Sequence, residues 1–331
     1  KIIFSKDYKY HMKILAIQNR MGIGDTVIFL PFIKALSKKF NTPISILVKE
    51  SSKADQYLKQ TQYIDEIIIL QRNSKINNRH NGLIGSFNLI KDLKNKNFDK
   101  IFIFNSSLRF YLITKLCRAS EIYQYPLFQK TKQHIIDTPK KFMKDKLNLD
   151  INEDPEIQIN EGSVLNSIKK FKINKNDINI LLGIGGSGPT KRIPAKTFLK
   201  IMDEISKIKR CRFFLATGKK HEEQIILKEV LETKFKNLCT PLDNYSIKET
   251  LPIIKNCNLA ICNDSSFSHL SAALGVKTIT LMADTPLIYG NYSSKMFPII
   301  PDGEQTVGHE TLGRERINPQ KILNQIYKII N

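Results

Sequence analysis

The chain contains no tryptophan, only five cysteines, and no apolar run of the roughly 18–20 residues that a membrane-spanning helix needs. Its start, from Lys1 to Met12, lacks the apolar core of a secretory signal, so we expect a cytoplasmic protein. The odd cysteine count and the lack of a Cys-x-x-Cys pair argue against a disulfide framework and a zinc site. We expect buried, reduced thiols at Cys117, Cys211, Cys239, Cys257 and Cys262.

Acidic residues are also few, since 31 Asp and Glu stand against 52 Lys and Arg, a formal net charge of +21. Such a charge favours polyanionic partners: nucleic acid, an anionic membrane surface or a phosphorylated substrate. A composition rich in Lys, Asn and Ile, as an AT-rich genome produces, explains the charge equally well. A polyanion-binding protein is therefore the non-enzymatic hypothesis, but no RNA-recognition or helix-turn-helix signature supports a nucleic-acid partner.

Short apolar runs alternate with helix-period segments along the chain. The runs are continuous rather than alternating, as in strands buried on both faces of a parallel sheet. They cover Lys13–Gln18, Ile44–Val48, Glu66–Leu70, Lys100–Asn105, Ile178–Gly183, Arg212–Thr217, Leu259–Asn263 and Thr278–Leu281. This alternation predicts an α/β protein with doubly wound, Rossmann-like sheets.

The alternation restarts near Ile178, after a polar interval from Asp145 to Asp177. We therefore expect two domains, at 1–160 and 175–312, followed by a segment, 313–331, whose helix packs back on the body. Two such domains would face a central cleft at the carboxyl ends of their strands, which is where ligands bind in this class.

The first motif follows the first strand and contains Gly22, Gly24 and Asp25. The glycines allow a tight turn and close approach of a ligand to the backbone. Asp25 lies at the start of a helix that we expect to begin near Thr26. Two interpretations remain open: a carboxylate that caps this helix, or a general base at the cleft.

A glycine-rich loop follows the strand that ends at Gly183 and continues to Pro194, where the next helix is expected to begin. It contains Gly-x-Gly-x-x-Gly, a weak signal by itself, and it is not a Walker A loop because no Gly-Lys-Ser/Thr follows. The hydroxyls of Ser187 and Thr190 and the cation Lys191 suit an anion such as a diphosphate.

A third motif, Asp264-Ser265-Ser266, ends a strand and starts a helix, whose exposed N–H groups form an anion site. His269 lies one turn into this helix and could reach the same anion, although a lone helical histidine is more often structural. Glu222 and Glu223 follow another strand, where they either bind a ribose diol or complement the helix dipole.

At these motifs the chain resembles glycosyltransferase family 9, the ADP-heptose:lipopolysaccharide heptosyltransferases. The matching residues are Gly24-Asp25 with Leu30-Pro31, Lys191 before Pro194, Gly218 with His221-Glu222-Glu223, and Asp264-Ser265-Ser266 with His269-Leu270. Four motifs in order make the resemblance specific, and it extends from about Met12 to the end of the chain. It implies a GT-B fold with an acceptor-binding first domain and a nucleotide-sugar-binding second domain.

The resemblance also implies roles for individual residues. Asp25 would be the base that deprotonates the acceptor hydroxyl, with Gly22 and Gly24 allowing the close approach. The donor site would comprise Ser187, Thr190 and Lys191 at the diphosphate, Glu222 or Glu223 at the ribose, Tyr245 at adenine, Asp264 at the transferred sugar, and Ser265, Ser266 and His269 around the phosphates.

The implied reaction is inverting transfer of a heptose, or a related sugar, from an ADP-sugar to a hydroxyl of the lipopolysaccharide core. No convincing Asp-x-Asp motif is present, so we expect no metal ion and no cofactor besides the ADP-sugar substrate. Lys191 and the helix start near Ser265 would stabilise the leaving diphosphate. The enzyme would be cytoplasmic, free or peripheral on the inner membrane, with the lysines from Lys130 to Lys146 meeting the anionic acceptor or the membrane.

Two departures from the family pattern concern the donor. Ser266 stands where glycine is usual, and Leu281–Pro286 replaces an aromatic-Gly-Pro-Thr stretch beside the donor sugar. Three alternative enzymes therefore remain: a glycosyltransferase with another nucleotide sugar for another glycolipid or a glycoprotein, a GT-B sugar-nucleotide epimerase, and, on the glycine loop alone, a nicotinamide-dependent dehydrogenase.

Overall fold

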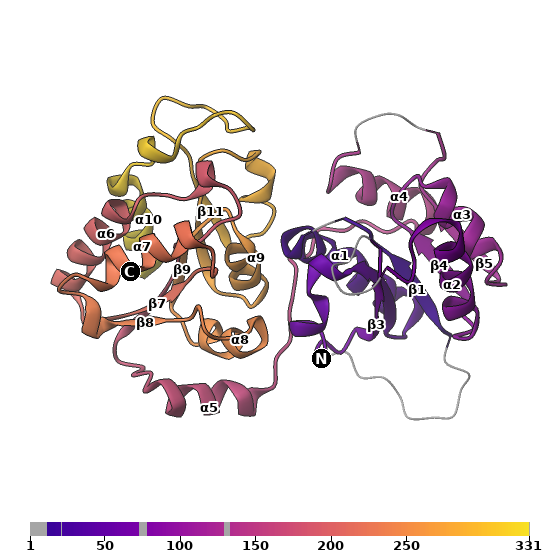
Figure 1. Cartoon of the computed structure of the whole chain (residues 1–331), viewed down its shortest axis with the longest axis horizontal. Coiled ribbons are helices and arrows are strands. Elements are labelled where there is room, and N and C mark those ends of the chain that lie inside the picture. Colours follow the sequence, from indigo (N-terminus) through magenta and orange to yellow (C-terminus); the bar gives the residue numbers. More distant parts are fainter. Residues whose placement is uncertain (1–11, 21, 73–77, 129–132, 331) are drawn as a thin grey trace. The chain divides into compact units, whose positions relative to one another are not determined.

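The computed structural model describes residues 12–20, 22–72, 78–128 and 133–330 and shows two compact units, Lys1–Gln158 and Ile159–Asn331 (Figure 1). Each unit has its own parallel sheet covered by helices. Lys130 and Lys132 lie outside the described residues. Among the residues that are described, no helix is both long enough and apolar enough to cross a membrane.

The first unit contains a sheet with the strand order β3-β2-β1-β4-β5, in which every neighbouring pair is parallel. The strands are β1 Ile14–Ile17, β2 Ile44–Lys49, β3 Ile64–Leu70, β4 Lys100–Ile103 and β5 Glu121–Gln124. The helices are α1 Ile23–Phe40, α2 Gly82–Lys94, α3 Leu108–Lys115 and α4 Asp137–Leu147, with short 3-10 helices η1 Glu50–Ser52 and η2 Ala54–Gln56. Apolar side chains fill both faces of β1, because parallel strands of this kind are covered on both sides.

The second unit contains a parallel sheet with the strand order β11-β10-β9-β6-β7-β8. The strands are β6 Ile178–Gly183, β7 Cys211–Ala216, β8 Cys239–Pro241, β9 Leu259–Asn263, β10 Lys277–Leu281 and β11 Met296–Ile299. The helices are α5 Glu161–Phe171, α6 Ala195–Ile208, α7 His221–Leu231, α8 Ile247–Lys255, α9 Ser266–Ala273 and α10 Pro319–Ile330, with 3-10 helices η3 Pro189–Lys191, η4 Lys236–Leu238, η5 Leu287–Tyr289 and η6 Arg314–Arg316.

The core of the second unit forms where the helices cover this sheet. Helix α10 places Ile322, Leu323 and Ile326 against the same core as β6 and α6, because these residues share one face of the helix. All five cysteines of the chain are free and buried, as expected. Burial raises the pKa of the Cys117 and Cys211 thiols to about 11, so they stay protonated at neutral pH.

The eight strands predicted from the sequence are all present, with ends that differ by up to two residues. Three further strands, β5, β8 and β11, were not predicted, and each lies at an edge of its sheet. An edge strand needs no continuous apolar run, and it tolerates proline because one side of its backbone is unpaired. Accordingly, β5 is only half-buried, and β8 and β11 each contain a proline, Pro241 and Pro298.

Each sheet reverses its winding direction once. In the first unit the reversal lies between β1 and β4, and in the second it lies between β6 and β9. Loops that leave the carboxyl ends of such a strand pair run in opposite directions, which opens a ligand-binding crevice between them. The loops after β6 and β9, and those after β1 and β4, are therefore the candidate sites.

Candidate functional site

The glycine-rich loop leaves β6 at the reversal point of the second sheet. It runs from Ile184 to Pro194 and contains the 3-10 helix η3, Pro189–Lys191. Helix α6 begins at Ala195 with Pro194 as its N-cap, one residue later than predicted. The loop thus places Lys191 close to the carboxyl edge of the sheet.

Asn263, the last residue of β9, holds this loop in place. Its side-chain amide donates to the carbonyl oxygens of Ile184 at 2.9 Å and Gly185 at 3.1 Å, and its Oδ1 accepts from the N–H of Ile193 at 3.4 Å. Asn263 is fully buried, so these hydrogen bonds fix both ends of the loop against the neighbouring strand. Asn263 is not among the predicted site residues, although a polar residue at the end of a buried strand is a usable signal.

Lys191 and Asp264 form an ion pair at this edge, with 2.8 Å between Lys191 Nζ and Asp264 Oδ2. On the other side of Asp264, His269 Nε2 lies 3.9 Å from Oδ1. The His269 ring stacks on Tyr292, and its Nδ1 is 2.7 Å from the Tyr292 hydroxyl. The fold therefore brings Lys191, Asp264 and His269 into one cluster, although the motifs that supply them are more than 70 residues apart in the sequence.

Asp264 is a carboxylate in this cluster. Burial of the side chain opposes ionisation, but the charges of His269 and Lys191 and the hydrogen bond from Lys191 outweigh it and hold the pKa of Asp264 below its usual value. Asp264 is only 6% exposed, whereas 24% of the Lys191 side chain is exposed. Lys191 is thus the member of the pair that an incoming anion can reach.

The start of helix α9 adds a second anion-attracting group. Ser265 is the N-cap of α9, but its side chain caps no backbone N–H group. Within the part of the chain that the structure describes, the buried Ser265 hydroxyl has no hydrogen-bond partner. The start of α9 lies at the edge that carries Lys191, and such a helix start attracts negative charge. The expectation that the helix starts within Asp264–Ser266 is confirmed.

Glu222 and Glu223 have different environments at the start of α7. Glu223 is buried, and its Oε1 accepts from the backbone N–H groups of Gly186 at 3.0 Å and Gly218 at 3.3 Å. A Cβ atom at Gly185 or Gly218 would lie 2.6 or 2.3 Å from its carboxylate oxygens, so both glycines leave room for Glu223. Glu223 therefore joins the loops after β6 and β7, while Glu222 is exposed.

The two glutamates make a matched pair of variants. Glu223→Ala leaves two backbone N–H groups without their acceptor, at a cost of about 1–3 kcal/mol each, so the melting temperature should fall clearly. Glu222→Ala should leave the melting temperature unchanged and, if this residue holds a ribose, weaken nucleotide binding. Calorimetry with ADP on both variants checks this, and a stable Glu223→Ala protein would contradict the assignment.

Thr190 and Ser187, both predicted to hold a diphosphate, also differ. Ser187 is exposed, whereas Thr190 is half-buried and lies close enough to Asp284, which follows β10, to help lower the pKa of that carboxyl. Asp284 also accepts from the N–H of Leu312 at 2.9 Å. Burial opposes the ionisation of Asp284, but these hydrogen bonds outweigh it and lower its pKa. Asp284 lies in the stretch that departs from the family pattern, and here it joins the end of β10 to the segment around Leu312.

Tyr245 makes its ring contacts away from the Lys191 cluster. Its ring packs edge-on against Phe171 of α5, with 5.2 Å between centroids, and Lys170 Nζ lies 5.1 Å from the ring centroid. Its loop, between β8 and α8, lies beside the loop after β7, since the Gln224 side chain donates to both Gly218 and Asp243. The adenine contact of Tyr245 stays a prediction.

Asp25 lies in the first unit at the third position of α1. The helix begins at Ile23, three residues earlier than predicted, so Asp25 sits within its first turn. Oδ2 accepts from the N–H of Gly22 at 3.0 Å, which caps the helix start. In the described residues Oδ1 has no hydrogen-bond partner, so the capping interaction leaves one carboxylate oxygen available.

Polar side chains gather on the loops after β1 and β4 of the first sheet and on the segment between β5 and α4. The Asn105 amide donates to Asn19 Oδ1 at 3.3 Å, and the Gln133 amide donates to the Ser106 hydroxyl at 2.5 Å. Arg20 donates to the Gln133 carbonyl at 3.0 Å. Amides, hydroxyls and a guanidinium match the hydroxyls and acidic groups of a carbohydrate. None of these residues is among the predicted site residues.

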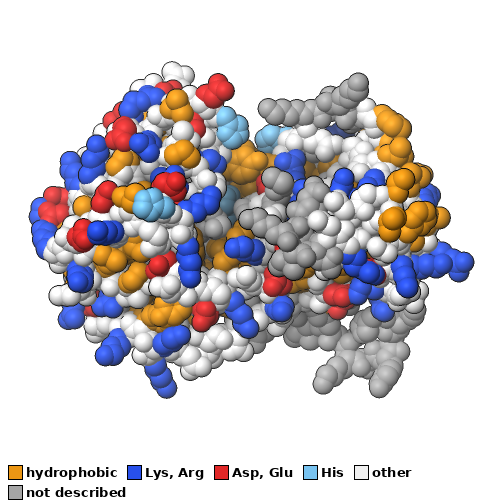
Figure 2. Space-filling view, viewed as in Figure 1, with side chains coloured by type: hydrophobic (Ala, Val, Ile, Leu, Met, Phe, Trp, Pro, Cys, Tyr) orange, Lys and Arg blue, Asp and Glu red, His pale blue; other side chains and the backbone are white. Residues whose placement is uncertain are grey.

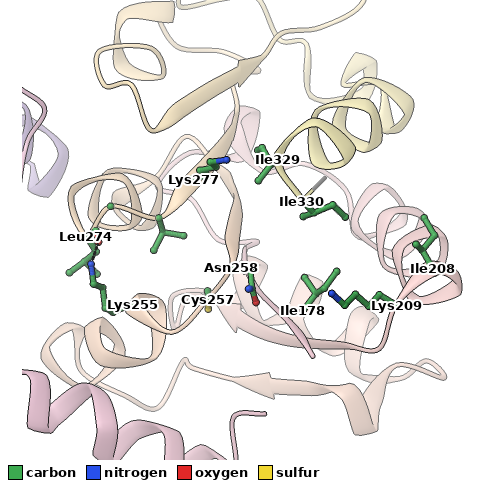
Figure 3. Close-up of a pocket in the computed structure, with 12 residues that line it drawn as sticks. Ile178, Ile208, Lys209, Lys255, Cys257, Asn258, Leu274, Lys277, Ile329 and Ile330 are labelled. Carbon is green, nitrogen blue, oxygen red and sulfur yellow. Dashed lines mark hydrogen bonds between the residues drawn. The ribbon is translucent and has the colours of Figure 1, made fainter. Parts of the chain in front are cut away.

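A cavity of about 530 Å³ lies at the opposite, amino-terminal edge of the second sheet (Figure 3). The C-terminal ends of α6, α8, α9 and α10 meet there, and Lys209, Lys255 and Lys277 line it. Lys255 donates to the carbonyl of Leu274 at the end of α9, at 2.6 Å. Helix C-termini carry partial negative charge, so these lysines complement the helices, and this cavity is unsuited to a diphosphate.

The structure is a doubly wound α/β protein whose second unit places Lys191 and the start of α9 at its carboxyl edge, and whose first unit carries Asp25 in the first turn of α1. The model of glycosyltransferase family 9 (heptosyltransferase) matches residues 86–300. The chain therefore belongs to glycosyltransferase family 9, and it is a glycosyltransferase rather than an epimerase, a dehydrogenase or a simple polyanion binder.

Individual relatives agree with this family. The chain is 24% identical to lipopolysaccharide heptosyltransferase 1 of Campylobacter coli, over 92% of this chain and 93% of that protein. A family 9 glycosyltransferase from Veillonella parvula superposes with a TM-score of 0.77 at 18% identity, covering 98% and 99% of the two chains. The E. coli ADP-heptose lipopolysaccharide heptosyltransferase II gives a TM-score of 0.71 at 16% identity, covering 96% and 98%. The fold is thus the predicted GT-B fold.

Proposed function

We propose that this glycosyltransferase moves a heptose from ADP-heptose to a hydroxyl of the lipopolysaccharide core. The relatives from Campylobacter coli and E. coli are both named as lipopolysaccharide heptosyltransferases, and the name of the second includes ADP-heptose. The observation that carries the proposal is the partly exposed Lys191, held by a buried carboxylate beside the free start of α9. A nucleoside diphosphate needs such a combination of a fixed cation and backbone N–H donors.

In this proposal the second unit stabilises the leaving group. Negative charge develops on the diphosphate as the bond to the anomeric carbon breaks, and Lys191 and the α9 N–H groups neutralise it without a metal ion. When the donor binds, the Lys191 ammonium group must contact both Asp264 and a phosphate, because Asp264 remains charged. Asp264 itself would face the hydroxyls of the sugar as a hydrogen-bond acceptor, with His269 between it and Tyr292.

The first unit would supply the acceptor side of the reaction. Asp25 Oδ1 would take the proton from the acceptor hydroxyl as that oxygen attacks the anomeric carbon from the face opposite the diphosphate, so that the configuration inverts. The hydrogen bond between Oδ2 and Gly22 would hold the carboxylate in its orientation meanwhile. Attack, proton transfer and departure of ADP then balance without any further reactant.

The acceptor and the location of the enzyme form part of the same proposal. A lipopolysaccharide core carries phosphates and acidic sugars, and the net charge of +21 favours such an anion. Helix α4 contributes exposed lysines at Lys140, Lys141, Lys144 and Lys146. Two of them, Lys141 and Lys144, pair with exposed aspartates, but such surface pairs are weak and can yield to an anionic acceptor or a membrane surface on the cytoplasmic side.

A thermal-shift panel tests the donor. ADP, UDP, GDP, CDP and NAD are added to the full chain and to Lys191→Ala. A ligand at a hundred times its dissociation constant adds about 2.7 kcal/mol of stability, so ADP should raise the melting temperature of the wild type selectively and lose this effect in the variant. A preference for UDP or GDP would change the donor, and no shift with any nucleotide would refute the Lys191 site.

A further inference from the structure

The first unit exposes a group of large apolar side chains on two adjacent helices. On α2 these are Leu83, Ile84 and Phe87, which are 83%, 78% and 68% exposed, and on α3 and its C-cap they are Leu108, Leu112 and Leu116. We call these six residues the α2–α3 surface. Figure 2 shows hydrophobic side chains gathered over the region of α3. Single exposed leucines are ordinary, but a contiguous group of this kind marks an interaction surface.

The core of the unit does not explain these residues. The opposite side of α3 already fills the core with Phe110 and Ile113 and, just past the helix end, Cys117. Leu108, Leu112 and Leu116 follow one another at four-residue spacing and form a separate, outward stripe. A helix that is apolar on both sides normally has a partner on both.

The two helices hold this surface in a fixed shape. The Arg109 guanidinium, on α3, donates to the Ser86 hydroxyl at 2.9 Å and to the His80 carbonyl at 2.6 Å. Both partners belong to α2 or to the turn before it. The N-terminal turns of α2 and α3, which carry Leu83, Ile84 and Leu108, are therefore joined side by side.

The charges around the surface indicate what covers it. Lys91 and Lys94 on α2, and Lys115 and Arg118 at the end of α3, are exposed. The acidic side chain on these helices, Asp92, accepts hydrogen bonds from Arg79 and is paired with His80. A second copy of the chain docked here would bring the same cations together, whereas an anionic lipid headgroup would neutralise them.

We propose that the α2–α3 surface docks on an anionic lipid bilayer, with the leucines and phenylalanine in the interface and the cations at the headgroups. α2 and α3 begin after β3 and β4, so their first turns lie at the carboxyl edge of the first sheet, the edge where Asp25 lies. A bilayer at this surface would keep a membrane-anchored acceptor near that edge. The docking itself does not depend on which sugar is transferred.

Co-sedimentation with vesicles tests the proposal. The full chain is mixed with vesicles of equal parts phosphatidylcholine and phosphatidylglycerol, and with phosphatidylcholine vesicles alone. The variant Phe87→Gln/Leu112→Gln/Leu116→Gln should lose about a hundredfold in affinity, because three apolar side chains no longer enter the interface. A matched control, Leu165→Gln/Ile208→Gln, changes side chains that are 53% and 61% exposed in the second unit and should bind normally.

Further measurements separate the outcomes. The triple variant should keep the melting temperature and the ADP affinity of the wild type, because the three replaced side chains are exposed. Vesicle binding is measured without a donor, so failure of the donor proposal would not affect this test. The variant Lys91→Gln/Lys94→Gln/Lys115→Gln should bind the phosphatidylglycerol vesicles more weakly than the wild type. Added salt should weaken binding of this variant less than it weakens binding of the wild type. The proposal is overturned if the wild type does not sediment, if the triple variant binds normally, or if size-exclusion chromatography shows an oligomer that the triple variant abolishes.

Discussion

Asp25→Asn should lower kcat by about 10²–10⁴-fold, the usual contribution of a positioned general base. Asparagine keeps the side-chain oxygen that accepts the hydrogen bond from Gly22, at 3.0 Å in the native chain, so the cap on α1 should survive. Only the helix-dipole contribution of the charge is lost, about 0.3–1 kcal/mol. Initial rates with a saturating acceptor, together with melting curves, measure both quantities.

The matched control for this variant is Asp137→Asn. Asp137 also lies in the first turn of a helix, α4, but its side chain is 76% exposed. It should lose the same small amount of helix-dipole energy and no activity. If Asp25→Asn retains its rate, Asp25 is a capping residue alone and the base lies elsewhere. If its ADP affinity falls with its rate, the division of donor and acceptor between the two units is wrong.

Lys191→Ala should lower kcat/KM by about 10²–10³-fold, because removal of one donor that stabilises a developing oxyanion typically costs about 2.7–4 kcal/mol. Nucleotide affinity should fall as well. The variant also leaves the buried Asp264 without its ion-pair partner, which destabilises the protein. Adding Asp264→Asn should therefore restore part of the melting temperature without restoring activity.

Lys196→Ala provides the control for Lys191. Lys196 lies five residues further on, its side chain is 77% exposed, and its partner is the exposed Glu315. Surface pairs of this kind contribute about 0–1 kcal/mol, so neither rate nor stability should change appreciably. Equal losses in the two variants would mean that the effect at Lys191 is general electrostatics rather than a specific contact.

The sequence predicted the architecture because the buried strands carry a strong signal. Strands such as Ile178–Gly183 are covered on both faces, which requires a continuous apolar run that is visible without any structure. The edge strands β5, β8 and β11 lack this requirement, and their half-polar sequences resemble loops. The predicted start of α1 was wrong by three residues because the prediction placed Asp25 just before the helix. Asp25 instead lies within the first turn and caps the helix from there.

The candidate site was predictable only in part, for a related reason. Lys191, Asp264 and His269 stand in motifs whose chemistry is evident from residue type and order. Asn263 and Asp284 act through hydrogen bonds to backbone or side-chain groups more than twenty residues away, and no local pattern reveals such partners. Likewise, the adjacent Glu222 and Glu223 are equivalent in sequence, and only burial shows that Glu223 joins two loops.

The most direct test of the central claim is a transfer assay with ADP-heptose and a lipopolysaccharide acceptor that lacks its heptose residues. Mass spectrometry of the acceptor and assay of released ADP are followed with the wild type and with Asp25→Asn. We predict that the wild type adds heptose and releases one ADP for each sugar added, whereas the variant does so at least a hundredfold more slowly. Transfer from UDP- or GDP-sugars in place of ADP-heptose, or release of ADP without any gain of mass on the acceptor, would contradict the proposed function.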